Sequence, residues 1–133
     1  MKRSYIRAGE FFDKECGITA IRVHSECVID ICLNSSSNTV LEEDVFIIAG
    51  FLHDIVRKQS SDKHHILAID YLKKFLKEYP VYEKFFDEIR DCIIHHRRFE
   101  NPQTMYAKIF QNAILLVPYT KKWREFEKRR MMK

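Results

Sequence analysis

A stretch in the middle of the chain, residues 45–56, is apolar at nearly every position. A helix that is apolar all round is stable in water only when neighbouring elements cover it on every side. This stretch therefore predicts a central helix, enclosed by further elements whose apolar faces turn toward it. Two polar residues, His53 and Asp54, interrupt the stretch near its C-terminal end.

Residues that favour tight turns are scarce, because the chain has only three glycines and three prolines. A β-sandwich or β-barrel normally needs more turns than these residues can supply. Apolar residues recur with helical periodicity in five segments, 18–32, 45–56, 63–79, 82–96 and 104–117, and a last segment, 121–133, is strongly charged. The sequence predicts an all-α fold, a single compact bundle of about six to seven helices.

The length of 133 residues is typical of one domain with one substantial core. We expect a single domain over residues 1–133, with the core at about 18–117 and a charged helix or tail at 118–133. Lys and Arg outnumber Asp and Glu by 23 to 19, which gives a formal net charge of +4. This small excess permits anionic ligands without requiring nucleic acid as a partner.

Cysteine usage and hydropathy bear on where the protein resides. The chain has neither C-x-x-C spacing nor the density of a disulfide scaffold among its cysteines, Cys16, Cys27, Cys32 and Cys92. The N-terminal residues lack an apolar core of signal-peptide length, and no stretch is apolar enough to cross a bilayer. We expect a cytoplasmic protein that does not interact with membranes.

The positions of one histidine and one acidic residue indicate a functional site. His24 lies on the apolar face of the first of these helices, three residues from both Ile21 and Cys27. Asp54 stands where a carboxylate is costly, because it is predicted to be buried and to lie at the negative end of a helix dipole. A bound cation would remove both penalties, so Asp54 with its neighbour His53 predicts a metal site.

Each of these residues could also have an ordinary structural role. A single histidine on an apolar face, such as His24, is more often a hydrogen-bonded core residue than a metal ligand. The pairs His64–His65 and His95–His96 stand at expected helix ends, where histidines also occur without a metal. It is the combination of these clusters with a buried acid that favours a metal site.

Taken in order, these segments resemble the HD superfamily of metal-dependent phosphohydrolases. The segment RVHSECV resembles the family's first histidine on an early helix, and FLHDIV is similar to the signature L-H-D-I. HHILAIDYLKKFL resembles the segment H-x-x-x-G-A-x-x-L of members with two metals, and IRDCIIHHR resembles I-x-x-H-H. The likeness extends from about Ile21 to Leu116.

This resemblance implies a set of metal ligands, namely His24, His53, Asp54, His64, His95 and His96. One ion would be held by the first histidine with the His53–Asp54 pair, and a second ion by Asp54 with the three later histidines. Such ligands suit a divalent transition metal, Fe, Mn, Zn, Ni or Co. His53 and Asp54 would act in catalysis together with Arg57 and Lys58, whose charges can meet a phosphate, as can those of Arg97 and Arg98.

One ligand of the family is missing from this chain. HD proteins carry a late aspartate, usually in an alanine–aspartate pair, and the segment AKIFQNAILL aligns with it but has Ile114 at that position. No acidic residue stands between Asn101 and Arg124, so a small shift of the alignment does not restore the ligand. Gln111 or Asn112 would have to offer an amide oxygen instead.

Two functions are compatible with this pattern. The first is a metal-dependent phosphohydrolase that acts on a nucleotide or other phosphate ester, with one or two ions. The second is a degenerate HD domain that binds a nucleotide or a protein partner without turnover. Ile114 favours the second, because an apolar side chain cannot replace a carboxylate, whereas the six remaining ligand-type residues favour the hydrolase.

The charged segment 121–133 allows a third interpretation. Its Trp123 and Phe126 lie among basic residues, and aromatic residues interleaved with basic ones can bind nucleic acid. A charged terminal helix more commonly docks its aromatic residues on the core or on a second subunit, which would make the protein a homodimer. We therefore expect a small-molecule substrate in preference to nucleic acid.

Overall fold

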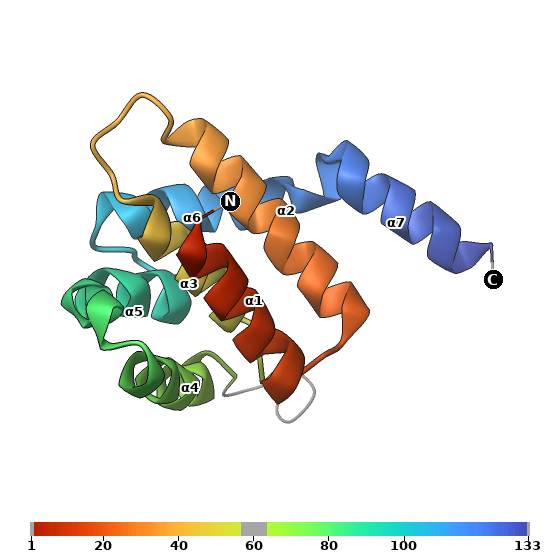
Figure 1. Ribbon diagram of the computed structural model, residues 1–133. Helices are drawn as coiled ribbons and strands as arrows, with labels where there is room; N and C mark the ends of the chain where they lie inside the picture. Colours follow the sequence, from red (N-terminus) through yellow and green to blue (C-terminus); the bar gives the residue numbers. More distant parts are fainter. Residues whose placement is uncertain (1, 57–63, 133) are drawn as a thin grey trace.

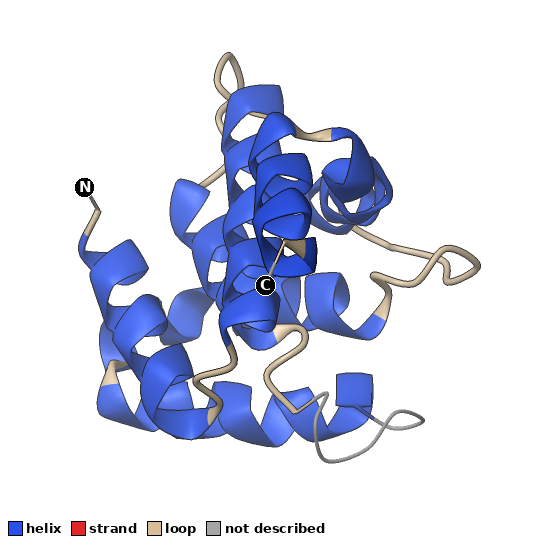
Figure 2. Cartoon of the chain, turned by 90° about the vertical axis from the view of Figure 1, so that its right-hand side faces the viewer, coloured by secondary structure: helices blue, strands red, loops and turns tan. Residues whose placement is uncertain are grey.

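The computed structural model describes residues 2–56 and 64–132, and every regular element in these ranges is helical (Figure 1 and Figure 2). The α-helices are α1 (Arg3–Glu15), α2 (Thr19–Ser35), α3 (Glu43–Leu52), α4 (His64–Glu78), α5 (Phe86–Ile94), α6 (Met105–Leu116) and α7 (Lys121–Met131). Two short 3₁₀ helices join them, η1 (Pro80–Phe85) and η2 (Val117–Tyr119). The predicted all-α bundle is confirmed.

The central helix of the bundle is α3, whose residues from Val45 to Leu52 are all buried. It packs against α1, α2 and α5, and Figure 1 shows α1 passing in front of it. The close approach of α2 and α3 depends on Gly50, because a Cβ atom at this position would overlap the side chain of Ile29. The helix ends four residues earlier than predicted, and residues 53–56 continue as turns.

Two parts of the fold differ from the expected helix ranges. α1 was not expected, yet it buries Ala8, Phe11 and Phe12, so the core extends toward the N-terminus beyond residue 18. These positions have the spacing of one helix face, so the sequence does carry the signal for this helix. The helix expected over 82–96 begins instead as η1, which starts at Pro80, and becomes α-helical only at Phe86.

A buried carboxylate fixes how α6 follows α5. Asp91 accepts hydrogen bonds from the backbone N–H groups of Gln103 (3.1 Å) and Thr104 (2.6 Å). Thr104 in turn caps α6, because its side chain accepts a hydrogen bond from the N–H of Ala107 at 3.1 Å. Burial raises the pKa of the Asp91 carboxyl, but hydrogen bonds from Thr104, His95 and Gln103 outweigh burial and hold the pKa below its ordinary value.

The charged C-terminal segment forms α7, in which no residue is fully buried. Thr120 caps this helix by accepting a hydrogen bond from the N–H of Trp123 at 3.3 Å. Lys122 pairs with Glu26 and Asp30 of α2 at 3.4 and 3.7 Å. Trp123 packs against the core, as expected for an aromatic residue that docks a terminal helix, while Figure 1 shows the far end of α7 extending away from the bundle.

Two observations relate to the expected location and organisation. Within residues 2–56 and 64–132, no helix combines the length and apolar character that crossing a membrane requires. All four cysteines are free thiols, three of them buried and Cys16 partly exposed. The single domain over residues 1–133 stays a prediction.

Candidate metal centre

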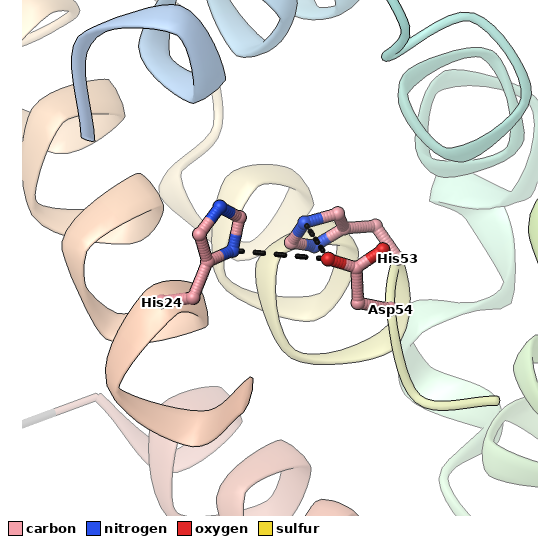
Figure 3. Close-up of side chains that lie close together, drawn as sticks. All are labelled: His24, His53 and Asp54. Atoms are coloured by element: carbon pink, nitrogen blue, oxygen red, sulfur yellow. Dashed lines mark ion pairs between the residues drawn. The ribbon is translucent and has the colours of Figure 1, made fainter. Parts of the chain in front are cut away.

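Two helices bring His24, His53 and Asp54 together at the end of α3 (Figure 3). Oδ2 of Asp54 is 3.4 Å from Nε2 of His53 and 3.8 Å from Nδ1 of His24. Ligand atoms about 2.0–2.2 Å from a tetrahedral ion lie roughly 3.3–3.6 Å from one another. The His53–Asp54 pair has this spacing, and the three donors, which all lie within 4.8 Å of each other, could close on one transition-metal ion by small side-chain rotations.

The end of α3 determines how His53 is presented. α3 ends at Leu52, and His53 continues in helical conformation at the C-cap, with φ −62° and ψ −31°. Its Nδ1–H donates a hydrogen bond to the carbonyl oxygen of Gly50 at 2.7 Å. Because a carbonyl can only accept, this bond fixes the tautomer and leaves the lone pair on Nε2, the nitrogen nearer to Asp54. Histidine ligands of metals are commonly oriented by such a bond from the other ring nitrogen.

The charge state of Asp54 suits a cation. The residue is 3% exposed and His53 is completely buried. Burial raises the pKa of the Asp54 carboxyl, but the imidazoles of His53, His96 and His24 outweigh burial and hold the pKa well below its usual range. The cluster therefore contains an ionised carboxylate in a largely desolvated place, where a bound cation is strongly favoured.

His96 stands beside this cluster, in the loop that follows α5. Its ring centroid is 5.1 Å from that of His53, and its Nδ1–H donates to the carbonyl oxygen of Ile93 at 2.6 Å, which leaves the lone pair on Nε2. α6 holds this loop in place, because Nε2 of Gln111 donates to the carbonyl oxygens of Arg97 at 2.7 Å and Glu100 at 3.0 Å. The amide nitrogen of Gln111, a residue considered as a substitute ligand, thus hydrogen-bonds to the loop backbone.

A cavity of about 260 Å³ opens at the cluster. Its lining combines imidazoles, a carboxylate, two arginines and two aliphatic side chains, namely His24, His53, Asp54, His96, Arg97, Arg98, Ile114 and Leu115. The arginines supply the positive charge that a phosphate group requires. Ile114, the residue aligned with the family's late aspartate, lies on the wall of this cavity.

A larger cavity of about 690 Å³ lies on the surface of α4, η1 and α5. Its lining has one acid and no histidine, and consists of Lys73, Leu76, Lys77, Pro80, Glu83 and Phe86. Since no metal donor set converges there, the chemistry belongs to the smaller cavity.

Of the remaining predicted ligands and catalytic residues, the structure describes the side chain of His95. Arg57 and Lys58 lie outside the described residues, and the side chain of His64, the first residue of α4, is also outside the description. Nδ1–H of His95 donates to Oδ1 of Asp91 at 2.6 Å, and this imidazole is 25% exposed. Among the described residues, the one group with metal-donor spacing is His24, His53 and Asp54. A second ion held by Asp54 and the three later histidines stays a prediction.

Trp123 is a neighbour of the cluster that the sequence did not lead us to expect. Its ring meets that of His24 edge-on, with centroids 5.9 Å apart and planes at 85°. It closes a second cavity of about 230 Å³, which is lined by Ala20, Ile21, His24, Asp54 and Trp123. The only local signal was a single tryptophan within a charged segment, and no spacing rule relates residue 123 to residue 24.

Comparison with known proteins agrees with this geometry. The chain matches the family model of the HD domain over residues 22–113, more than half of its length. No curated protein and no solved structure matches it. The matched segment contains His24, the His53–Asp54 pair and the His95–His96 pair, and the His–His–Asp cluster fits a divalent metal. The chain belongs to the HD domain family.

Proposed function

We propose that this protein is a metal-dependent phosphohydrolase that acts on a nucleotide or other phosphate ester. The observation that carries the proposal is the buried, ionised Asp54, with Nε2 of His53 and Nδ1 of His24 at 3.4 and 3.8 Å, next to a cavity that two arginines line. A carboxylate with two imidazoles suits Fe, Mn, Zn, Ni or Co. Three protein ligands with an open coordination position are typical of catalytic sites, as distinct from structural ones.

His96 is the best-placed residue to complete the ligand set. Ile114 offers no donor atom, whereas His96 lines the same cavity and has its Nδ1 occupied by the Ile93 carbonyl. A rotation of its ring toward Asp54 would add a third imidazole to the cluster. The proposal therefore favours one ion, held by three histidines and one aspartate, with a coordination number of five or six that keeps positions open for water and phosphate.

Each part of the site has a separate task. A bound divalent cation polarises a phosphoryl oxygen and favours attack by water at neutral pH. Arg97 and Arg98 bind the other phosphoryl oxygens and stabilise the negative charge that develops on them. Asp54 is a poor proton acceptor, because its pKa is held well below its usual range. Its task is to hold the cation and orient the attacking water.

The proposal includes a cytoplasmic setting, which the four free cysteines support because a reducing compartment keeps thiols free. It also includes a small-molecule substrate in preference to nucleic acid, since the net charge of +4 is modest. Association into a homodimer is a further part of the proposal.

A second candidate is a degenerate HD domain that binds a nucleotide or a protein without turnover. The observation in its favour is Ile114 on the wall of the cavity, where the family's late aspartate would otherwise complete the ligand set. This candidate expects phosphate ligands to bind and no metal to be retained.

The decisive experiment measures metal content and phosphatase activity together. Purified protein is analysed for bound metals, then tested with nucleotides and simple phosphate esters in the presence of Mn, Fe, Ni, Co or Zn. We expect metal-dependent hydrolysis that Asp54→Ala abolishes. The matched control is Asp70→Ala, which removes an exposed acid from α4, and we expect it to keep both metal and activity. Protein that retains no metal and stays inactive with every ion would favour the non-catalytic candidate.

A further inference from the structure

We propose that Trp123 forms one wall of a subsite for the leaving group of the substrate, and that this subsite selects phosphate esters with a flat, apolar leaving group. The inference rests on the proposed function, because it assigns the two ends of a phosphate ester to two cavities. It assigns a role to Ala20, Ile21 and Trp123, which take no part in the hydrolytic step.

Two cavities of similar size meet at the metal cluster. Both are lined by His24 and Asp54, and their volumes are about 260 and 230 Å³. Beyond these shared residues, the first is lined by Arg97 and Arg98 together with His53, His96, Ile114 and Leu115, whereas the second is lined by Ala20, Ile21 and Trp123. Of the two cavities, only the first therefore contains cationic side chains, and the lining that the second adds to the cluster is apolar.

This asymmetry fixes the orientation of a bound ester. The phosphorus–oxygen bond that is cleaved must lie at the metal cluster, so the phosphoryl group and the leaving group point to opposite sides of it. The anionic phosphoryl oxygens favour the arginines. The leaving group is then directed toward Trp123, whose ring offers a large apolar surface with few rotatable bonds.

Several contacts hold Trp123 in this position. Thr120 caps α7 one turn before it, and Lys122 ties the helix to Glu26 and Asp30 of α2. The Trp123 ring also packs against Phe126 with centroids 5.4 Å apart. The tryptophan is thus fixed before any ligand binds, which lowers the entropic cost of using it for recognition.

The apolar wall of this cavity comes from outside the segment that the family model covers. That segment spans residues 22–113, whereas Ala20, Ile21 and Trp123 all lie beyond its limits. Ala20 and Ile21 belong to α2, the helix that also carries His24, whereas Trp123 belongs to α7, which starts after the end of the matched segment. A volume of about 230 Å³ is below the roughly 300–1,000 Å³ typical of sites for drug-sized ligands, so it suits a small ring system.

The test compares two phosphonates that cannot be hydrolysed, phenylphosphonate and methylphosphonate, by calorimetric titration of the Mn²⁺-loaded protein. We expect wild-type protein to bind the phenyl compound about ten-fold more tightly, as stacking on one aromatic side chain provides. Trp123→Ala should remove this preference and leave the affinity for methylphosphonate unchanged. Trp123→Phe should keep most of the preference, because a smaller aromatic ring remains.

Two further variants separate recognition from folding. Ala20→Phe adds a large side chain to a residue of α2 that lines the same cavity, and should weaken the binding of phenylphosphonate alone. Tyr119→Ala removes an aromatic residue that is 70% exposed and outside the lining of the apolar cavity, and should change neither affinity. Equal affinities of the wild-type protein for both phosphonates would overturn the subsite while leaving the hydrolase intact. Failure to bind either compound would overturn both proposals.

Discussion

At the scale of single residues, the unusual feature is a carboxylate buried at the end of an apolar helix. Asp54 is 3% exposed, and an isolated carboxylate in such a place is costly. Two imidazoles lie within 4 Å of it and stabilise its ionised form, and a divalent cation at the same place would neutralise the charge. The sequence was sufficient to pick out His24, His53 and Asp54, because an aspartate is rarely buried in an apolar run unless it is paired or binds a metal.

The position of Ile114 leads to a test at the same scale. Ile114→Asp places a carboxylate on the wall of the cavity that Asp54 also lines. We expect at least about ten-fold tighter metal binding, since even outer-shell partners of a metal contribute 10–100-fold to affinity. Without metal, the variant should be less stable than wild type, because two carboxylates then repel each other. Calorimetric titration with Mn²⁺ and urea unfolding measure the two effects.

The control for this variant is Leu116→Asp, two residues further along α6. Leu116 is 49% exposed and is not part of the cavity lining, so its replacement should leave metal affinity as in wild type. Unchanged or weaker binding by Ile114→Asp would mean that residue 114 does not face the ion.

At the scale of helices, the site depends on how α2 crosses α3. His24 comes from α2, and the His53–Asp54 pair follows the end of α3. A shift of either helix against the other therefore changes the distances within the cluster. The helix ranges follow from local periodicity and were largely predictable, whereas the crossing depends on a contact between Gly50 and Ile29, residues 21 positions apart. Local patterns carry no information about such a contact, nor about the hydrogen bond that directs His95 to Asp91.

Replacing Gly50 with alanine tests this dependence. In an ordinary helix, Gly→Ala stabilises by about 0.5–1 kcal/mol. Here the added Cβ atom would overlap the Ile29 side chain, and overpacking of a core costs about 1–3 kcal/mol. We therefore expect Gly50→Ala to lower the free energy of unfolding, measured in urea, and to weaken Mn²⁺ binding as His24 moves away from Asp54.

A second glycine provides the comparison. A Cβ atom at Gly9 of α1 would meet the end of the flexible Arg22 side chain at 3.1 Å, so Gly9→Ala should be close to neutral. Adding Ile29→Ala to the Gly50 variant should restore part of the lost metal affinity. Full stability and full metal binding in Gly50→Ala alone would contradict this account of the helix crossing.

At the scale of the whole molecule, α7 packs beside the candidate metal site, although it lies outside the segment that matches the HD domain. The HD segment ends at residue 113, and α7 starts at Lys121. Composition and turn residues were enough to predict the all-α bundle, and the order of the histidine motifs was enough to predict the family. That the aromatic residues of α7 dock on the core was expected, but their position beside the cluster was not predictable, because it depends on the tertiary packing of Trp123 and on ion pairs between Lys122 and α2.

Metal binding should stabilise the entire fold, since the ligands come from separate parts of the chain that only folding brings together. An ion present at about 100 times its dissociation constant adds about 2.7 kcal/mol. For a chain of this length, that corresponds to a rise in Tm of roughly 10 °C, measured by circular dichroism with Mn²⁺ or Zn²⁺.

Mg²⁺ should have a much smaller effect on Tm, because it prefers oxygen ligands to imidazole. Asp54→Ala should show no rise with any of these ions. An equal rise in that variant would mean that the metals bind elsewhere on the protein.

The tryptophan beside His24 has a practical consequence. It is the only tryptophan in the chain, so the ultraviolet fluorescence of the native protein comes mainly from one position, with its ring centroid 5.9 Å from that of a predicted metal ligand. Paramagnetic ions such as Co²⁺ and Ni²⁺ quench a nearby indole. Metal binding to the native protein can therefore be followed in solution by the fluorescence of Trp123, without attaching a dye.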